Sequence, residues 1–300
     1  MSWLSPYLNE EVFLVRDASQ FEIRMLAQLS GDKLLCAQLN SGEDIHPQVA
    51  HTVFGWSLER SKEEKPRVIA KQLHFGIIFG LQPPAIYRKC RRLKVKTTLE
   101  EVRTAHGNYF NKYTGVKEFR EYCIEYAREN GRTIPNIFGM SRELYISNER
   151  EEGHAFWANQ AVNTPVQGSA AQFLLLCLAI IKERSEKYAL LRNNMRNEIH
   201  DSLVVTPKLK ELVVADRLLE EVMERECVEE AAKRFGIKMK VPLASEAKIG
   251  FRFGTMVKYD RKKQNLETIV DSWCAQNVKV EKYFVEDPLR FVDLQRGEAV

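Results

Sequence analysis

The chain has 300 residues, 44% of them hydrophobic, and can therefore bury a substantial core in one large domain or two interleaved ones. Its 45 Lys and Arg residues against 41 Asp and Glu residues give a net charge of +4, which permits a polyanionic partner without requiring one. The longest apolar run, Phe173 to Ile181, is too short to span a bilayer, and the N-terminus has no basic segment followed by an apolar one. We therefore expect no membrane anchor and no secretion.

The six cysteines are scattered along the chain, without a CxxC pair and without a close histidine partner. This spacing favours neither a zinc site nor a disulfide framework. A reducing, cytoplasmic location fits this cysteine pattern best.

The first elements predicted in chain order are a strand, a turn and a helix. EVFLVRDAS, residues 11–19, is typical of a β-strand that ends near Asp17, and residues 20–32 continue with the i, i+3, i+4 apolar spacing of a helix. From about residue 43 to 130 the pattern is helical and charged. The prolines of the segment Gly80 to Pro84 must interrupt a helix there.

The second half of the chain begins with a long apolar helix, predicted around residues 164–184. NEIHDSLVVTP, Asn197 to Pro207, then predicts two short strands that meet at a tight corner. The corner carries Asp201, and a turn aspartate often only hydrogen-bonds its own backbone. An amphipathic helix follows at residues 208–227. From about residue 259 the sequence becomes irregular, which suits a tail that docks on something.

Two aspartates, Asp17 and Asp201, are each predicted at the end of a strand. If these strands are neighbours in one sheet, the carboxylates lie a few ångströms apart and repel each other unless divalent cations neutralise them. Magnesium is the natural candidate. Two such ions about 4 Å apart support in-line displacement at phosphorus, so the pair predicts two Mg²⁺ ions bound by Asp17 and Asp201.

The segment RVIAKQLHFGIIFG carries Arg67, Lys71, Phe75 and Phe79 at intervals of four residues. On a helix these residues form one stripe, with two cations followed by two aromatic rings. The cations can hold phosphates while a ring stacks on a base. An ordinary amphipathic helix with solvated cations has the same spacing, so the stripe alone leaves both interpretations open.

Four segments, in the same order, resemble the polymerase motifs of family A DNA polymerases. They are DASQFEIR from Asp17, RVIAKQLHFGIIFG from Arg67, AVNTPVQGSAAQ from Ala161 and EIHDSLVV from Glu198. The connecting pieces MLAQLSGD, EDIHPQVAHTVFG and NIFGMSREL are also similar to that family. The resemblance runs from about Val12 to Val257.

The resemblance implies an α+β fold: a polymerase palm whose antiparallel sheet carries both aspartates, with helical fingers inserted into it. We expect the palm at residues 1–40 and 140–258, the fingers at 41–139 and, at 259–300, a C-terminal tail of unknown role on which a partner could dock. The thumb and exonuclease domains of the family are expected to be absent. This suggests a natural short chain, such as one from a bacteriophage in its host cytoplasm. A second polypeptide would then supply the thumb and could also supply a proofreading exonuclease.

The resemblance also assigns roles in nucleotide binding. Glu22 takes the place of the family's steric gate, whose side chain fills the space of a ribose 2′-hydroxyl, so the substrates are expected to be dNTPs. Arg67 and His46 would contact the triphosphate. Lys71 would protonate the departing pyrophosphate as a general acid. Phe75 and Phe79 would lie beside the incoming nucleotide.

Four further residues are expected to contact primer-template DNA: Asn163, Gln167, His200 and Arg142. For the first two, the segment NTPVQG has another interpretation, namely the start of a helix with a proline in its first turn. The basic segment Tyr87 to Lys96, with six cations and no acid, either follows the template or is a solvated helix face.

Some positions depart from the family pattern. Phe79 stands where the family commonly has a tyrosine that anchors the gate glutamate. Ser202 stands where DNA polymerases of this family usually have glutamate, and His-Asp-Ser is similar to single-subunit RNA polymerases. Asn159 replaces a frequent arginine. The resemblance implies template-directed DNA synthesis. The alternatives are an RNA polymerase or primase and a catalytically silent subunit that only binds nucleic acid.

Overall fold

The computed structural model describes residues 10–78, 80–94, 96–144, 152–266 and 268–270. Within them the chain forms two compact units. One, here called the sheet unit, comprises residues 10–17, 181–221 and 245–270. The other, the helical unit, comprises residues 18–180 and 222–244. The palm and fingers boundaries expected at residues 40, 139 and 258 follow functional divisions of the family, and they stay a prediction.

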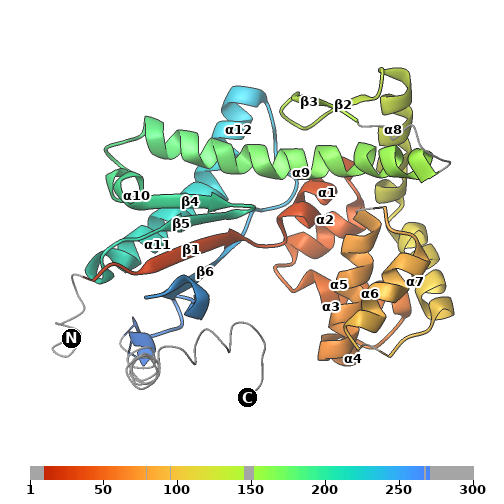
Figure 1. Cartoon of the computed structure of the whole chain (residues 1–300), viewed down its shortest axis with the longest axis horizontal. Helices are drawn as coiled ribbons and strands as arrows, with labels where there is room; N and C mark the ends of the chain where they lie inside the picture. Colours follow the sequence, from red (N-terminus) through yellow and green to blue (C-terminus); the bar gives the residue numbers. More distant parts are fainter. Residues whose placement is uncertain (1–9, 79, 95, 145–151, 267, 271–300) are drawn as a thin grey trace, which may run out of the picture. The chain divides into compact units, whose positions relative to one another are not determined.

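The sheet unit is built on five strands in the order β4-β5-β1-β6-β7, of which Figure 1 labels the first four. Their bounds are Phe13–Ala18 for β1, Met195–Ile199 for β4, Ser202–Val205 for β5, Ser245–Gly250 for β6 and Val257–Tyr259 for β7. β5 is antiparallel to both β1 and β4, and β6 is antiparallel to β7. The predicted strand ending near Asp17 and the predicted hairpin are thus confirmed. β5 lies between two strands and is buried along its whole length, which is why its sequence is almost entirely apolar.

The sheet unit contains α10, Ala189–Asn194, and α11, Leu212–Glu220, which follows a short 3₁₀ turn at Leu209–Glu211. α11 buries Leu212, Ala215 and Leu219, the three- and four-residue spacing that the sequence predicted. The helical path continues through a π-helical turn, Glu221–Glu226, into α12, Cys227–Phe235, of the helical unit.

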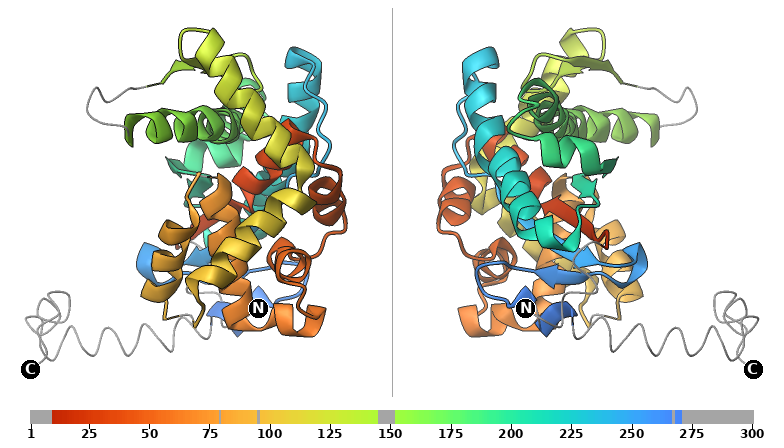
Figure 2. Two further views of the ribbon diagram at one scale, coloured as in Figure 1. Left: turned by 90° about the vertical axis from the view of Figure 1, so that its right-hand side faces the viewer. Right: turned by 90° about the vertical axis from the view of Figure 1, so that its left-hand side faces the viewer.

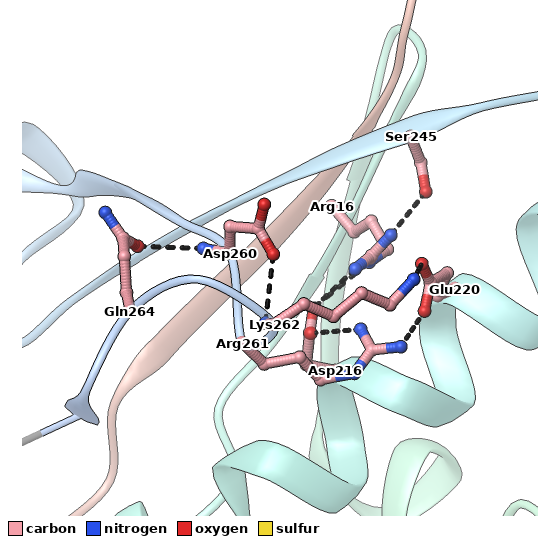
Figure 3. A network of polar contacts seen from close by, with 8 residues as sticks. All are labelled: Arg16, Asp216, Glu220, Ser245, Asp260, Arg261, Lys262 and Gln264. Carbon is pink, nitrogen blue, oxygen red and sulfur yellow. Dashed lines mark hydrogen bonds and ion pairs between the residues drawn. The ribbon is translucent and has the colours of Figure 1, made fainter. Parts of the chain in front are cut away.

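A buried ionic network holds the sheet unit together (Figure 3). Asp216 of α11 has no exposed surface, and its Oδ1 accepts hydrogen bonds from Nε and Nη2 of Arg16 at 3.1 and 2.8 Å. Its Oδ2 accepts from Nη1 of Arg261 at 2.6 Å, and Arg261 also pairs with Glu220. Arg16 Nη1 donates to Ser245 Oγ at 2.6 Å. The network thereby joins β1, β6, α11 and the segment after β7.

The segment from residue 259, expected to be a separate tail, begins as part of the sheet unit. Tyr259 pairs with Ala247 across β7 and β6 and is 5% exposed. Together with the ion pairs of Arg261, this pairing attaches the first residues of the segment to the sheet. Residues 271–300 lie outside the described part of the chain.

The helical unit begins with α1, Phe21–Ser30, and α2, Lys33–Asn40. It continues with α3, Ile45–Phe54, α4, Leu58–Lys62, α5, Glu64–Ile78, α6, Pro83–Arg92, α7, Leu99–Lys112, and α8, Thr114–Glu129. Helices α3 to α7 pack on one another, as Figure 2 shows in orange and yellow. The predicted helical stretch from 43 to 130 is confirmed. The break at Gly80 to Pro84 is confirmed too, because α5 ends at Ile78 and α6 begins at Pro83.

After a small hairpin of β2, Thr133–Pro135, and β3, Ser141–Glu143, the chain enters α9, Glu152–Glu183. This helix is one long element in Figure 1 and begins twelve residues before the predicted start. The interpretation of NTPVQG as a helix start is therefore wrong, since Pro165 lies inside the helix. Trp157 and Ala161 upstream are buried, and this packing outweighs the proline penalty of about 3 kcal/mol.

From Trp157 to Glu183, α9 is long and apolar enough to cross a membrane by length and composition alone. However, 61% of its most apolar 18-residue window is buried inside the protein. The ring of Phe173, in the middle of this stretch, lies 6.4 Å from that of Phe21 in α1. This burial is typical of the core helix of a globular protein.

Candidate active site

The two predicted metal-binding aspartates lie at the same end of neighbouring strands. Asp17 of β1 is directly opposite Ser202, the first residue of β5, and Asp201 immediately precedes Ser202. The Ser202 hydroxyl donates a hydrogen bond to Oδ1 of Asp17. The sheet register thus brings Asp17 and Asp201 together, as the sequence predicted, and both are partly exposed.

The turn that carries Asp201 has only two residues, because Ile199 pairs with Ser202. His200 in this turn has a φ of 57°, a left-handed conformation that non-glycine residues seldom adopt. Its side chain is exposed. The tight turn therefore keeps Asp201 at the strand end, with His200 beside it on the surface.

The donor set at this strand end suits magnesium. The described residues contain no group of three or more His, Cys, Asp or Glu side chains that could enclose an ion on their own. Mg²⁺ usually keeps several waters and is bound in proteins by one or two carboxylates together with substrate phosphates. Asp17 and Asp201 offer two carboxylates on adjacent strands, which fits this mode of binding.

In the helical unit, α5 carries the predicted cations and the first aromatic ring of the stripe. Arg67 is exposed, and its Nε and Nη2 lie 2.7 and 2.6 Å from Oδ2 of Asp44. Lys71 is exposed, and its Nζ lies 5.9 Å above the centre of the half-buried Phe75 ring. The stripe is therefore present as far as Phe75, whereas Phe79 lies outside the described residues.

Asp44 is a residue that sequence reasoning missed. Its Oδ1 accepts from the backbone N–H of His46 and caps α3, while its other oxygen pairs with Arg67. An aspartate just before an apolar helical run is a recognisable N-cap signal. No sequence signal indicated that the same side chain would neutralise one edge of the Arg67 guanidinium, 23 residues further along the chain.

His46 is only 4% exposed and lies against the rings of His74 and Phe75. Burial lowers the pKa of His46 to about 4; Asp44 opposes this shift, and the cations Arg67 and Lys71 reinforce it. At neutral pH the imidazole is therefore uncharged. It therefore adds no positive charge to the cations of α5, and its contact with a triphosphate stays a prediction.

Glu22, Gln167 and Asn163, which the sequence suggested separately, form one hydrogen-bonded chain. Gln167 Nε2 donates to Glu22 Oε1 at 2.9 Å, and Asn163 Nδ2 donates to Gln167 Oε1 at 3.0 Å. Glu22 belongs to the first turn of α1, and the other two lie one turn apart on α9. No sequence pattern linked Glu22 to Gln167, because 145 positions separate them.

The other expected nucleic-acid contacts are on the surface. Arg142 is exposed on β3, where it pairs with Ile134 of β2. On α6, Ile86 and Cys90 face the interior, while Arg88, Lys89 and the last-turn arginines are exposed. The cations of the basic segment on α6 thus form a solvated helix face. Contact of Arg142 or of this face with DNA stays a prediction.

Comparison with known proteins agrees with this fold. DNA polymerase family A matches residues 4–255, and the chain belongs to this family. A DNA polymerase I from Caldicellulosiruptor bescii is 30% identical over 249 residues, and one from Mycobacterium leprae is 32% identical over 241 residues. The matches cover 81% and 79% of this chain, but only 26% and 24% of those relatives. The chain thus spans about a quarter of the length of these curated relatives.

A solved structure, described as the POL domain of Pol1 from M. smegmatis in complex with DNA primer-template and dNTP, resembles the fold with a TM-score of 0.67. It is 24% identical, and the match covers 81% of this chain and 40% of that one. The expected combination of helices and an antiparallel sheet, similar to a polymerase domain, is therefore confirmed.

Proposed function

We propose that this chain catalyses template-directed DNA synthesis, with dNTPs as substrates and primer-template DNA as its partner. The observation that carries the proposal is the pair Asp17 and Asp201 at the ends of neighbouring strands, in a chain of DNA polymerase family A. The resemblance to a polymerase domain bound to primer-template and dNTP supports the choice of substrates.

The proposed reaction is nucleotidyl transfer. The primer 3′-oxygen forms a bond with the α-phosphorus of the dNTP, the bond from that phosphorus to its bridging oxygen breaks, and pyrophosphate leaves. Asp17 and Asp201 would hold two Mg²⁺ ions. The chemistry that these ions supply when bound is polarisation of phosphoryl oxygens and activation of the primer hydroxyl.

The cations of α5 act on the leaving group in this proposal. Lys71 is exposed and can donate its proton to the departing pyrophosphate. Arg67 presents to phosphates the donors that Asp44 does not occupy, namely Nη1 and the second N–H of Nη2. Phe75 would lie beside the base or sugar of the nucleotide, and Glu22 would exclude a ribose 2′-hydroxyl.

The proposed location is the cytoplasm. The relatives named above give no support for a second polypeptide that supplies a thumb. A bacteriophage origin likewise has no support from these comparisons.

The test is primer extension by the purified chain with Mg²⁺ and dNTPs at low salt, beside Asp17→Asn and Asp201→Asn. We expect each variant to lose about a hundredfold or more in rate, as when one group that stabilises transition-state charge is removed. Glu198→Gln, an exposed carboxylate of the same hairpin, is the matched control and should retain activity. Wild-type rates in both aspartate variants would overturn the proposal.

Two outcomes identify the alternatives. Preferential use of ribonucleotides would point to RNA synthesis, which the Ser202 position also suits. A folded wild-type chain that binds primer-template without extending it would point to a silent nucleic-acid-binding subunit.

A further inference from the structure

The carboxylate of Glu22 does not simply project into solvent from the start of α1. Its Oε1 accepts a hydrogen bond from Gln167 Nε2 at 2.9 Å, on a helix that belongs to a distant part of the sequence. Hydrogen bonds to a charged acceptor are stronger than those between neutral groups. This contact therefore selects one direction for a side chain that otherwise has several rotamers of similar energy.

The amide of Gln167 is itself oriented. Its Oε1 accepts from Asn163 Nδ2 at 3.0 Å, so its NH₂ group is the side that remains for Glu22. Asn163 is one helical turn before Gln167, the spacing at which two side chains on α9 can meet. A reversed Gln167 amide would place its oxygen against the Glu22 carboxylate, which is repulsive.

The two helices that carry this chain are fixed against each other by apolar packing. Phe21, which precedes Glu22, is 5% exposed, and its ring lies 6.4 Å from that of the fully buried Phe173. Val166, beside Gln167, is also fully buried. The backbones at both ends of the Glu22 to Gln167 contact therefore belong to the packed core of the helical unit.

We propose that Gln167 is a positioning residue for Glu22, and that Asn163 orients Gln167 for this task. The inference rests on the proposed function, in which Glu22 excludes ribonucleotides. Gln167 thus determines how strictly the site selects deoxyribose, in addition to any contact that it makes with DNA. In the family, a tyrosine at the place of Phe79 is expected to anchor the gate glutamate. In this chain the amide of Gln167 on α9 takes that role.

The expected consequence is a loss of sugar selectivity. Without Gln167, the Glu22 carboxylate regains its rotamers and turns toward water. We expect Gln167→Ala to lower the ratio of kcat/KM for dNTP to that for rNTP by about three- to tenfold, the scale of one hydrogen bond. Asn163→Ala should lower the ratio less, because Gln167 can still reach Glu22 in part of its rotamers.

The decisive experiment is a double-mutant cycle on this ratio with Glu22→Ala, Gln167→Ala and the double variant, beside the control Gln172→Ala on the same helix. If Gln167 acts through Glu22, its substitution changes the ratio in the wild-type background and has no further effect in Glu22→Ala. An equal loss of dNTP and rNTP incorporation, or an undiminished effect without Glu22, would overturn the inference.

A second measurement distinguishes failure of this inference from failure of the proposed function. The wild type, Glu22→Ala, Gln167→Ala and the double variant are unfolded with urea. The coupling free energy between Glu22 and Gln167 is obtained from their free energies of unfolding, which requires no activity. Coupling without primer extension would retain the contact and reject the polymerase proposal. Absence of coupling would reject the contact itself.

Discussion

His74 is a buried histidine on α5, the helix that carries Arg67 and Lys71. Its side chain has no exposed surface, and its ring packs against those of His46 and Tyr109. Neither ring nitrogen has a hydrogen-bond partner among the described residues. Burial lowers the pKa of His74 to about 3, so the folded protein keeps this imidazole neutral.

Acid should therefore destabilise the protein through His74. The unfolded chain binds a proton there near its ordinary pKa of about 6.5, whereas the folded chain does so only near 3. The free energy of unfolding keeps its full contribution from His74 above about pH 6.5. It falls as the pH decreases from about 6.5 toward 3, by at most about 1.4 kcal/mol per pH unit for one histidine.

We expect His74→Phe to reduce this slope, because phenylalanine fits an apolar site and does not titrate. Urea unfolding between pH 7.5 and 5 measures it. Tyr109→Phe is the control, since burial raises the pKa of this phenol well above 10 and its loss leaves the acid range unchanged. An unchanged slope in His74→Phe would show that other groups, such as His46, produce the whole acid dependence.

At the scale of elements, the turn between α5 and α6 depends on Gly80. Its φ is 69°, and a Cβ at this position would lie 1.9 Å from Oδ1 and 2.4 Å from Cγ of Asn159 on α9. The glycine thus allows both the left-handed turn and the close approach of α9. From the family resemblance, Asn159 is noted only as the replacement of a frequent arginine. In the structure its side chain packs against this turn.

Gly80→Ala should destabilise the protein by more than the left-handed strain alone, which is about 1–2 kcal/mol. Gly131→Ala is the matched control, because Gly131 has a similar φ of 61° and open space around its Cα. Thermal or urea unfolding measures the stability that each variant loses. The excess loss in Gly80→Ala over Gly131→Ala is the part that the steric clash with Asn159 contributes. Adding Asn159→Ala should remove that part, and a Gly80→Ala variant no worse than Gly131→Ala would contradict this account.

At the scale of the whole chain, residues outside the family-matched range stabilise the sheet. Arg261 lies beyond residue 255, where the family match ends, yet it contacts the fully buried Asp216 that also holds Arg16 of β1. Removing one cation from a buried carboxylate is costly, because the negative charge is then only partly compensated and has no contact with water.

Arg261→Met should therefore destabilise the protein by about 3 kcal/mol, with little dependence on salt. Lys262→Ala removes the neighbouring, largely exposed cation and should cost less than about 1 kcal/mol. Denaturant unfolding at low and high ionic strength compares the two. Equal stability of these variants would mean that the segment after β7 is dispensable for the sheet.

The sequence by itself determined the elements whose signals are local. Alternating apolar residues around Asp17 and Asp201 predicted the strands, the prolines after Gly80 predicted the end of α5, and the ordered motifs predicted the polymerase family. The start of α9 was missed because local rules treat Pro165 as a helix entry. Packing of residues upstream of it carries the helix through the proline.

Only the tertiary structure decided which distant side chains meet. Asp44 with Arg67, Gln167 with Glu22, and Asp216 with Arg16 and Arg261 are pairs between elements far apart in sequence. Each residue, taken alone, has the pattern of a cap, a helix surface or a solvated charge. The physical reason is that hydrogen bonds and ion pairs depend on distances of about 3 Å, which are set by packing and register and not by spacing along the chain.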